Sequence, residues 1–91
     1  MTHSPPIPQA HTRCLELLQT YPNSQALQSC KTQLEYLQDL VDGRRQDAER
    51  LNDIVLGLYA ARELESLDMG FAEMLYVVED VVKTLKAERL R

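Results

Sequence analysis

Apolar residues recur at intervals of three and four along the stretch from residue 23 to residue 43. This spacing places them on one side of a helix. Asn23 or Ser24 can cap the start of that helix, and Gly43 can end it in the left-handed conformation that glycine adopts at low cost. The pattern predicts a helix over residues 24–42 on which the other helices pack. Its apolar residues are Leu27, Cys30, Leu34, Leu37 and Val41.

A shorter helix is expected before it, over residues 9–20, with Cys14, Leu15, Leu17 and Leu18 as its apolar residues. The following Tyr21-Pro22 ends it, because a residue before proline avoids the helical region. Residues 1–8 contain three prolines in four positions, which disfavour a helix before Pro8. We therefore expect residues 1–8 to form a flexible or extended tail.

Two further helices are predicted after Gly43, over residues 47–64 and 68–89. Gly57 lies inside the first, and an interior glycine indicates close approach of another helix. Asp68 can cap the second, whose apolar residues cover more than one stripe. The expected fold is an all-α, compact antiparallel bundle of four helices, with residues 9–91 as a single domain. In the helix over 47–64 the residues expected to face inward are Leu51, Ile54, Val55, Leu58 and Ala61.

The chain has 91 residues and a net charge of −4, which disfavours nucleic acid and anionic membranes as partners and favours a basic protein. No run approaches the ~20 apolar residues of a membrane span. The first residues lack the basic and apolar regions of a secretion signal, so a cytoplasmic location is expected. Cys14 and Cys30 fall within helical stripes and are interpreted as buried free thiols rather than a disulfide.

The residues of catalytic or metal sites are sparse in this sequence. The two histidines, His3 and His11, both lie near the N-terminus. His11 and Cys14 are one helical turn apart and could share a zinc ion with outside ligands, but a structural zinc site needs four ligands. The three glycines are scattered, so there is no phosphate-binding loop. We expect no enzyme activity, no cofactor and no bound metal.

Carboxylates are the abundant polar groups. Glu35, Asp39 and Asp42 share one side of the helix over 24–42, without a Lys or Arg on that side. Six acids and no basic residue occur between positions 63 and 82. These acids form either a solvated helix face or a surface for a basic partner. The residues proposed to contact a partner are Glu35, Tyr36, Asp39, Asp42, Glu63, Glu65, Glu73 and Tyr76, the tyrosines because their rings favour interfaces.

The order of several residues between Leu17 and Val78 resembles the small all-helical immunity proteins paired with type VI secretion toxins that hydrolyse NAD(P). The residues that carry the resemblance are Tyr21-Pro22, Leu27, Gln33-Leu34, Tyr36, Arg50-Leu51, Leu56-Gly57, Ala60, Glu63 and Asp68.

The resemblance implies a cytoplasmic antitoxin, active in bacterial competition, that binds its cognate toxin domain and occludes the active site. The toxin would be an NAD(P) glycohydrolase or a related nucleotide-targeting toxin, such as an ADP-ribosyltransferase. The alternative is an export chaperone or adaptor that holds a partner's amphipathic segment. The protein is expected to be a monomer or a weak homodimer.

Overall fold

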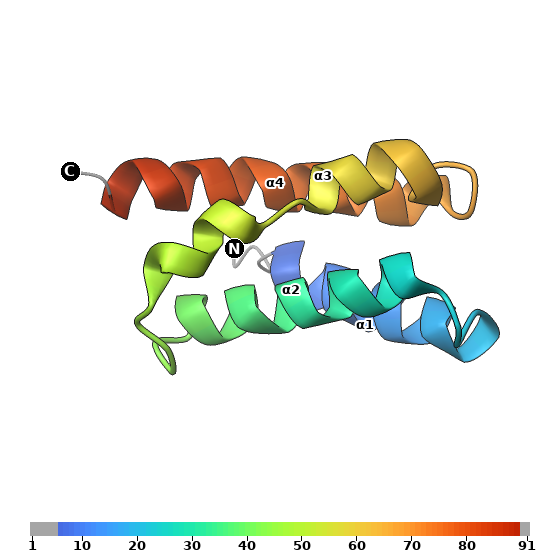
Figure 1. The fold of residues 1–91 in the computed structure, drawn as a ribbon, viewed down its shortest axis with the longest axis horizontal. Coiled ribbons are helices and arrows are strands. Elements are labelled where there is room, and N and C mark those ends of the chain that lie inside the picture. Colours follow the sequence, from blue (N-terminus) through green and yellow to red (C-terminus); the bar gives the residue numbers. More distant parts are fainter. Residues whose placement is uncertain (1–5, 90–91) are drawn as a thin grey trace, which may run out of the picture.

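The computed structural model describes residues 6–89 and is helical, with no strand in that range (Figure 1). One layer is formed by α1 (Pro6–Thr20) and α2 (Gln25–Val41). The other is formed by α4 (Met69–Arg89) and a shorter third helix, and α4 also packs on α1. The predicted all-α globule of four helices with antiparallel contacts is therefore confirmed. No helix of the described part combines the length and apolar character needed to cross a membrane.

The helix predicted from the opening pattern is α2, and its ends are formed as expected. The Ser24 hydroxyl accepts a hydrogen bond from the Leu27 amide at 3.2 Å, and Gly43 has a φ of 80°. Four of the five predicted stripe residues are fully buried: Leu27, Cys30, Leu34 and Leu37. Val41 is an exception, because it is 48% exposed and Leu40 fills the last inward position.

The first helix starts earlier than predicted, at Pro6 instead of residue 9. A proline is tolerated in the first turn because the amides there have no partner within the helix. Because the helix starts at Pro6, Ile7 lies within it, and its side chain is buried in the hydrophobic core. Residues 6–8 of the expected tail are thus helical, while residues 1–5 lie outside the described range. Of the four apolar residues named for this helix, Leu15 is exposed.

The third helix is interrupted, which corrects the prediction of one helix over 47–64. It begins as a 3-10 helix, η1 (Ala48–Asp53), and resumes as α3 (Leu56–Tyr59) and a π-helical turn, η2 (Ala60–Leu64). Ile54 and Val55 between them are not helical. The Gln33 side chain of α2 stabilises the break, because its Oε1 accepts a hydrogen bond from the Val55 amide at 2.9 Å.

The break changes which residues of the third helix face the core. Leu51 and Ile54 are buried as predicted, but Val55, Leu58 and Ala61 are exposed. The irregular step at residues 54–55 rotates the following helix, so that a different stripe with a spacing of four faces inward. The buried residues after the break are Leu56, Ala60 and Leu64.

Two contacts to α4 follow the predictions. Glu79 of α4 approaches Gly57 so closely that a Cβ there would lie 3.1 Å from Glu79 Cγ, and Glu79 Oε1 accepts a hydrogen bond from the Gly57 amide at 3.2 Å. Asp68 Oδ1 accepts from the Phe71 amide at 2.9 Å and caps the start of α4. Asp68 also forms an ion pair with Arg13, which joins α1 to α4.

Candidate functional site

The three carboxylates predicted to lie unneutralised on α2 have basic partners in the structure. Glu35 Oε2 is 2.9 Å from Lys31 Nζ and 3.1 Å from His11 Nε2. The Lys31 hydrogen bond is the main cause of the lowered pKa of Glu35. Asp39 and Asp42 both pair with Arg44, at 3.7 and 3.2 Å. The prediction missed the pairs of Arg44 because Arg44 lies beyond Gly43, where the chain folds back along the end of α2. It overlooked Lys31, which lies one helical turn before Glu35 in the same helix.

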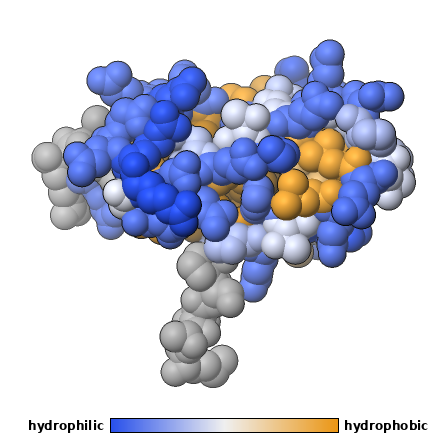
Figure 2. Space-filling view, turned by 90° about the horizontal axis from the view of Figure 1, so that it is seen from below, coloured by the Kyte–Doolittle hydropathy of each residue, from blue (hydrophilic) through white to orange (hydrophobic). Residues whose placement is uncertain are grey.

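The face on which α1 and α2 lie nearest the viewer is largely hydrophilic, with one apolar patch toward its right-hand end (Figure 2). Glu35 pairs with Lys31, and Asp39 and Asp42 share Arg44, so two cations offset most of the charge of these three acids on α2.

Tyr36 faces inward, which corrects its expected place beside the acidic side of α2. Its side chain is buried, and its hydroxyl donates a hydrogen bond to the Asp47 carbonyl at 2.6 Å. The Arg45 guanidinium lies over the ring, 5.0 Å from its centroid. Tyr36 therefore fixes the connection that follows α2 and has little surface left for another protein.

Five of the six acids between positions 63 and 82 divide into two groups, and the sixth, Glu65, accepts a hydrogen bond from the Tyr76 hydroxyl. Asp68 and Glu79 hold the fold together, as helix cap and as acceptor for the Gly57 amide. The side chains of Glu63, Glu73 and Asp80 form no ion pair or hydrogen bond within residues 6–89. The interpretation as a surface for a basic partner thus applies to this second group and to Glu65, which has no basic partner within residues 6–89.

Glu73 and Asp80 lie on an exposed stripe of α4 together with large apolar side chains. We define the α4 stripe as Met69, Glu73, Tyr76, Val77 and Asp80, whose spacing places them on one side of a helix. Met69 and Val77 are 52% and 51% exposed. The Tyr76 hydroxyl donates to Glu65 Oε2 at 2.5 Å, and this bond raises the pKa of Tyr76. Of the predicted contact residues, the structure thus brings together Glu65, Glu73 and Tyr76.

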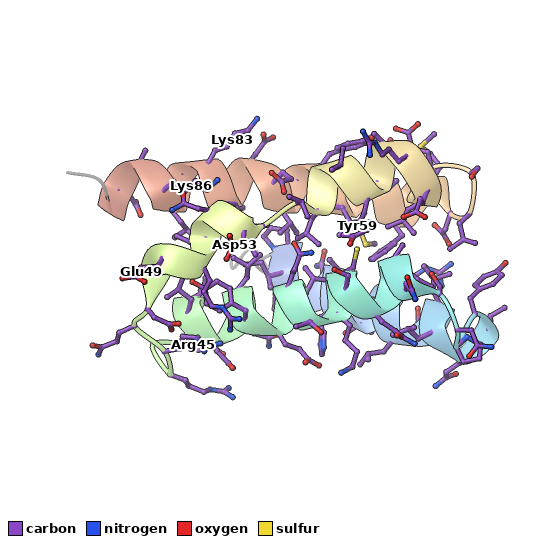
Figure 3. All side chains as sticks on the ribbon, viewed as in Figure 1. Arg45, Glu49, Asp53, Tyr59, Lys83 and Lys86 are labelled. Carbon is purple, nitrogen blue, oxygen red and sulfur yellow. The ribbon has the colours of Figure 1, made fainter. Side chains whose placement is uncertain are left out.

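Glu63 lies apart from this stripe, at a hollow of about 440 Å³ beside the third helix. Val55, Leu58, Tyr59 and Arg62 form the rest of the lining, and Tyr59 lies between the two helical layers (Figure 3). The sequence pattern assigned Val55 and Leu58 to the core, so it could not identify this hollow. The hydrogen bond from the Val55 amide to Gln33, which stabilises the break beside this hollow, forms only in the folded chain.

The described side chains do not assemble a reactive centre. Within residues 6–89, no group of three or more His, Cys, Asp and Glu residues is placed to hold a metal ion. Cys14 and Cys30 are free and buried, as predicted. Burial raises the pKa of Cys14 to about 11 and that of Cys30 to about 12, so both remain protonated and weakly nucleophilic near neutral pH.

This arrangement of side chains supports contacts at the protein surface. A comparison with known proteins identifies the family of the chain. The family model Tsi6 matches residues 2–84. The chain belongs to the Tsi6 family. Members of this family are type VI secretion immunity proteins, so the chain is an immunity protein for a type VI secretion toxin and not an enzyme. Comparisons with curated proteins and with solved structures gave no match.

Most residues that carried the resemblance to immunity proteins have structural roles in this Tsi6-family chain. Gln33 holds the break in the third helix, Tyr36 anchors the connection after α2, and Asp68 caps α4. Glu63 and Arg50 are the exposed charged residues among them. The shared residues therefore mainly maintain the fold. The surface that contacts the toxin has to be inferred from the exposed charged and apolar side chains.

Proposed function

We propose that this protein is the cytoplasmic antitoxin of an NAD(P)-hydrolysing or related nucleotide-targeting toxin, which it inhibits by binding and occluding the active site. Membership of the Tsi6 family supports the general role, and the resemblance described above supports the toxin class. The observation that carries the mechanism is the set of exposed carboxylates without basic partners, next to exposed apolar side chains on one helix.

Occlusion requires a rigid body that presents charge and apolar surface without chemistry of its own. The acids without partners accelerate encounter with a cationic protein, while desolvated apolar anchors set the rate of dissociation. The protein acts in this proposal as a monomer or a weak homodimer, without a cofactor.

The experiment is co-purification with the toxin encoded beside this protein, followed by NAD(P) hydrolysis with and without it. We expect a stable complex and loss of hydrolysis at stoichiometric amounts. A complex in which the toxin stays fully active would contradict occlusion and would indicate the alternative, an export chaperone. The exposed apolar residues Met69 and Val77 of α4 are the observation that favours this alternative.

A further inference from the structure

The α4 stripe combines exposed apolar area with two carboxylates that lack partners, Glu73 and Asp80, whereas the hollow beside Glu63 has one such carboxylate and also contains the basic Arg62. Met69, Tyr76 and Val77 account for three of the eight large apolar side chains that are exposed within residues 6–89. Glu73 and Asp80 flank Tyr76 and Val77 along the helix. An apolar centre with charged groups at its margin is the usual composition of a protein interface.

We infer that the α4 stripe is the surface that meets the toxin, and that it faces the cationic, phosphate-binding lining of the toxin's nucleotide site. This inference rests on the proposed function and narrows it to one face and one partner chemistry. A site that binds NAD(P) must attract phosphate groups, so its lining is rich in positively charged side chains and amide donors.

The charge on the stripe suits such a lining. Glu73 and Asp80 are seven residues apart, which is about 10 Å along a helix. Glu65, held by the Tyr76 hydroxyl, adds a third carboxylate at its side. No basic residue lies between Met69 and Asp80. The exposed side of a helix is also convex, so it can enter a cleft that is shaped for a nucleotide.

The same charges argue against a second copy of this chain as the occupant. A two-fold antiparallel pairing centred on Tyr76 and Val77 would place Glu73 opposite the partner's Asp80. Two such like-charge contacts would form without a basic group between them, and like charges that face each other across an interface weaken association.

The chain offers a matched control for charge reversal. Glu49 and Asp53 belong to η1, whereas Glu73 and Asp80 belong to α4, and Figure 3 shows η1 between the left-hand parts of α4 and α2. All four acids are exposed and have no ion pair within the described range. The double variants E73K/D80K and E49K/D53K change the net charge of −4 by the same amount. A difference between them therefore reports the position of the charge and not its total.

The experiment measures Kd for a catalytically inactive toxin by calorimetry, after thermal melting has shown that each variant is folded. We expect E73K/D80K to weaken binding about tenfold or more, because each reversal places a cation against a cationic lining. E49K/D53K should stay within about twofold of the parent protein, as is usual for surface charges outside an interface. Val77→Asp should also weaken binding although it adds negative charge, because it removes an apolar contact.

A competition experiment tests the partner chemistry. Inorganic pyrophosphate at saturating concentration should raise the apparent Kd of the parent protein for the toxin, because both ligands need the same cations. Unchanged affinity in pyrophosphate, equal Kd values for the two double variants, or a homodimer that Val77→Asp dissociates would each overturn the inference. Failure of the parent protein to inhibit the toxin would instead overturn the proposed function, so the two failures are distinguishable.

Discussion

Asp68 shows how much one short side chain contributes to this fold. One of its oxygens accepts from the Phe71 amide at 2.9 Å, and the other forms the ion pair with Arg13. We expect Asp68→Ala to lower the free energy of unfolding by about 1–2 kcal/mol, as for other lost helix caps. Asp68→Asn should cost less, because an amide oxygen can still accept. Urea denaturation measures both, and equal losses would show that the charge matters and the cap does not.

The ionisation of Asp68 gives a pH dependence with a defined sign. The Phe71 amide, followed by Arg13, lowers the pKa of Asp68 below its ordinary value of 3.8. The stabilisation is therefore fully present above that value and is lost as the pH falls through the lower pKa of the folded state. Urea midpoints of the parent protein and Asp68→Asn should converge in this acidic range. A gap that stays constant down to the lowest pH would contradict the assignment.

Two tyrosines provide a comparison between a buried and an exposed hydroxyl. Tyr36→Phe leaves the Asp47 carbonyl without its donor and should cost about 1 kcal/mol of unfolding free energy. Tyr76→Phe removes an exposed bond to Glu65 and should change stability by less than about 0.5 kcal/mol. The measurement is again urea denaturation, and a larger loss at Tyr76 would show that the Glu65 contact supports the fold.

At the scale of elements, the third helix is where sequence periodicity and structure diverge. Residues 47–64 contain a helical pattern that continues through Ile54 and Val55, and its spacing does not mark an interruption, although Ile54, Val55 and Gly57 are weak helix formers. The interruption depends on Gln33, which lies 22 residues before Val55. The spacing of apolar residues does not show that Gln33 will contact this segment. The two ends of α2 were predictable, by contrast, because Ser24 and Gly43 act on their own neighbouring backbone.

The contact between α3 and α4 gives a prediction for paired substitutions at Gly57 and Glu79. Gly57→Ala adds helix propensity, but its Cβ would lie 3.1 Å from Glu79 Cγ. In a Glu79→Ala background that obstacle is absent, so Gly57→Ala should be more favourable there by up to about 1 kcal/mol. A double-mutant cycle by urea denaturation measures the coupling, and additive effects would show that Glu79 moves aside freely.

At the scale of the whole molecule, the two thiols report how the core opens. Cys14 lies in α1 and Cys30 in α2, within one buried cluster. The Cys14 thiol donates a hydrogen bond to the Leu27 carbonyl at 3.3 Å. Because burial raises the pKa of both thiols, a thiol reagent at pH 8 should label the folded protein slowly and at one common rate set by global unfolding. Fast labelling of one cysteine would reveal a local opening. The urea-unfolded chain, in which both react quickly, is the control.

The distribution of charge over the surface is also a property of the whole molecule. The net charge of −4 was known from composition, but it is not spread evenly among unpaired groups. Lys31 and Arg44 compensate the acids of α2, whereas Glu73 and Asp80 remain without partners in the described range. The predicted contact residues thus separate into a paired set and an exposed set. The spacing of four between Lys31 and Glu35 indicates one of these pairs in the sequence, whereas the pairs of Arg44 require the turn after α2.

The sequence alone determined the number of helices, the ends of α2, the cap of α4 and the presence of buried free thiols. These features depend on periodicity and on residues that act on backbone within a few positions, so they can be read locally. Only the tertiary structure decided that the third helix breaks, that Tyr36 turns inward, and that Asp68 pairs with Arg13. Those outcomes depend on groups distant in sequence that meet only when the chain folds.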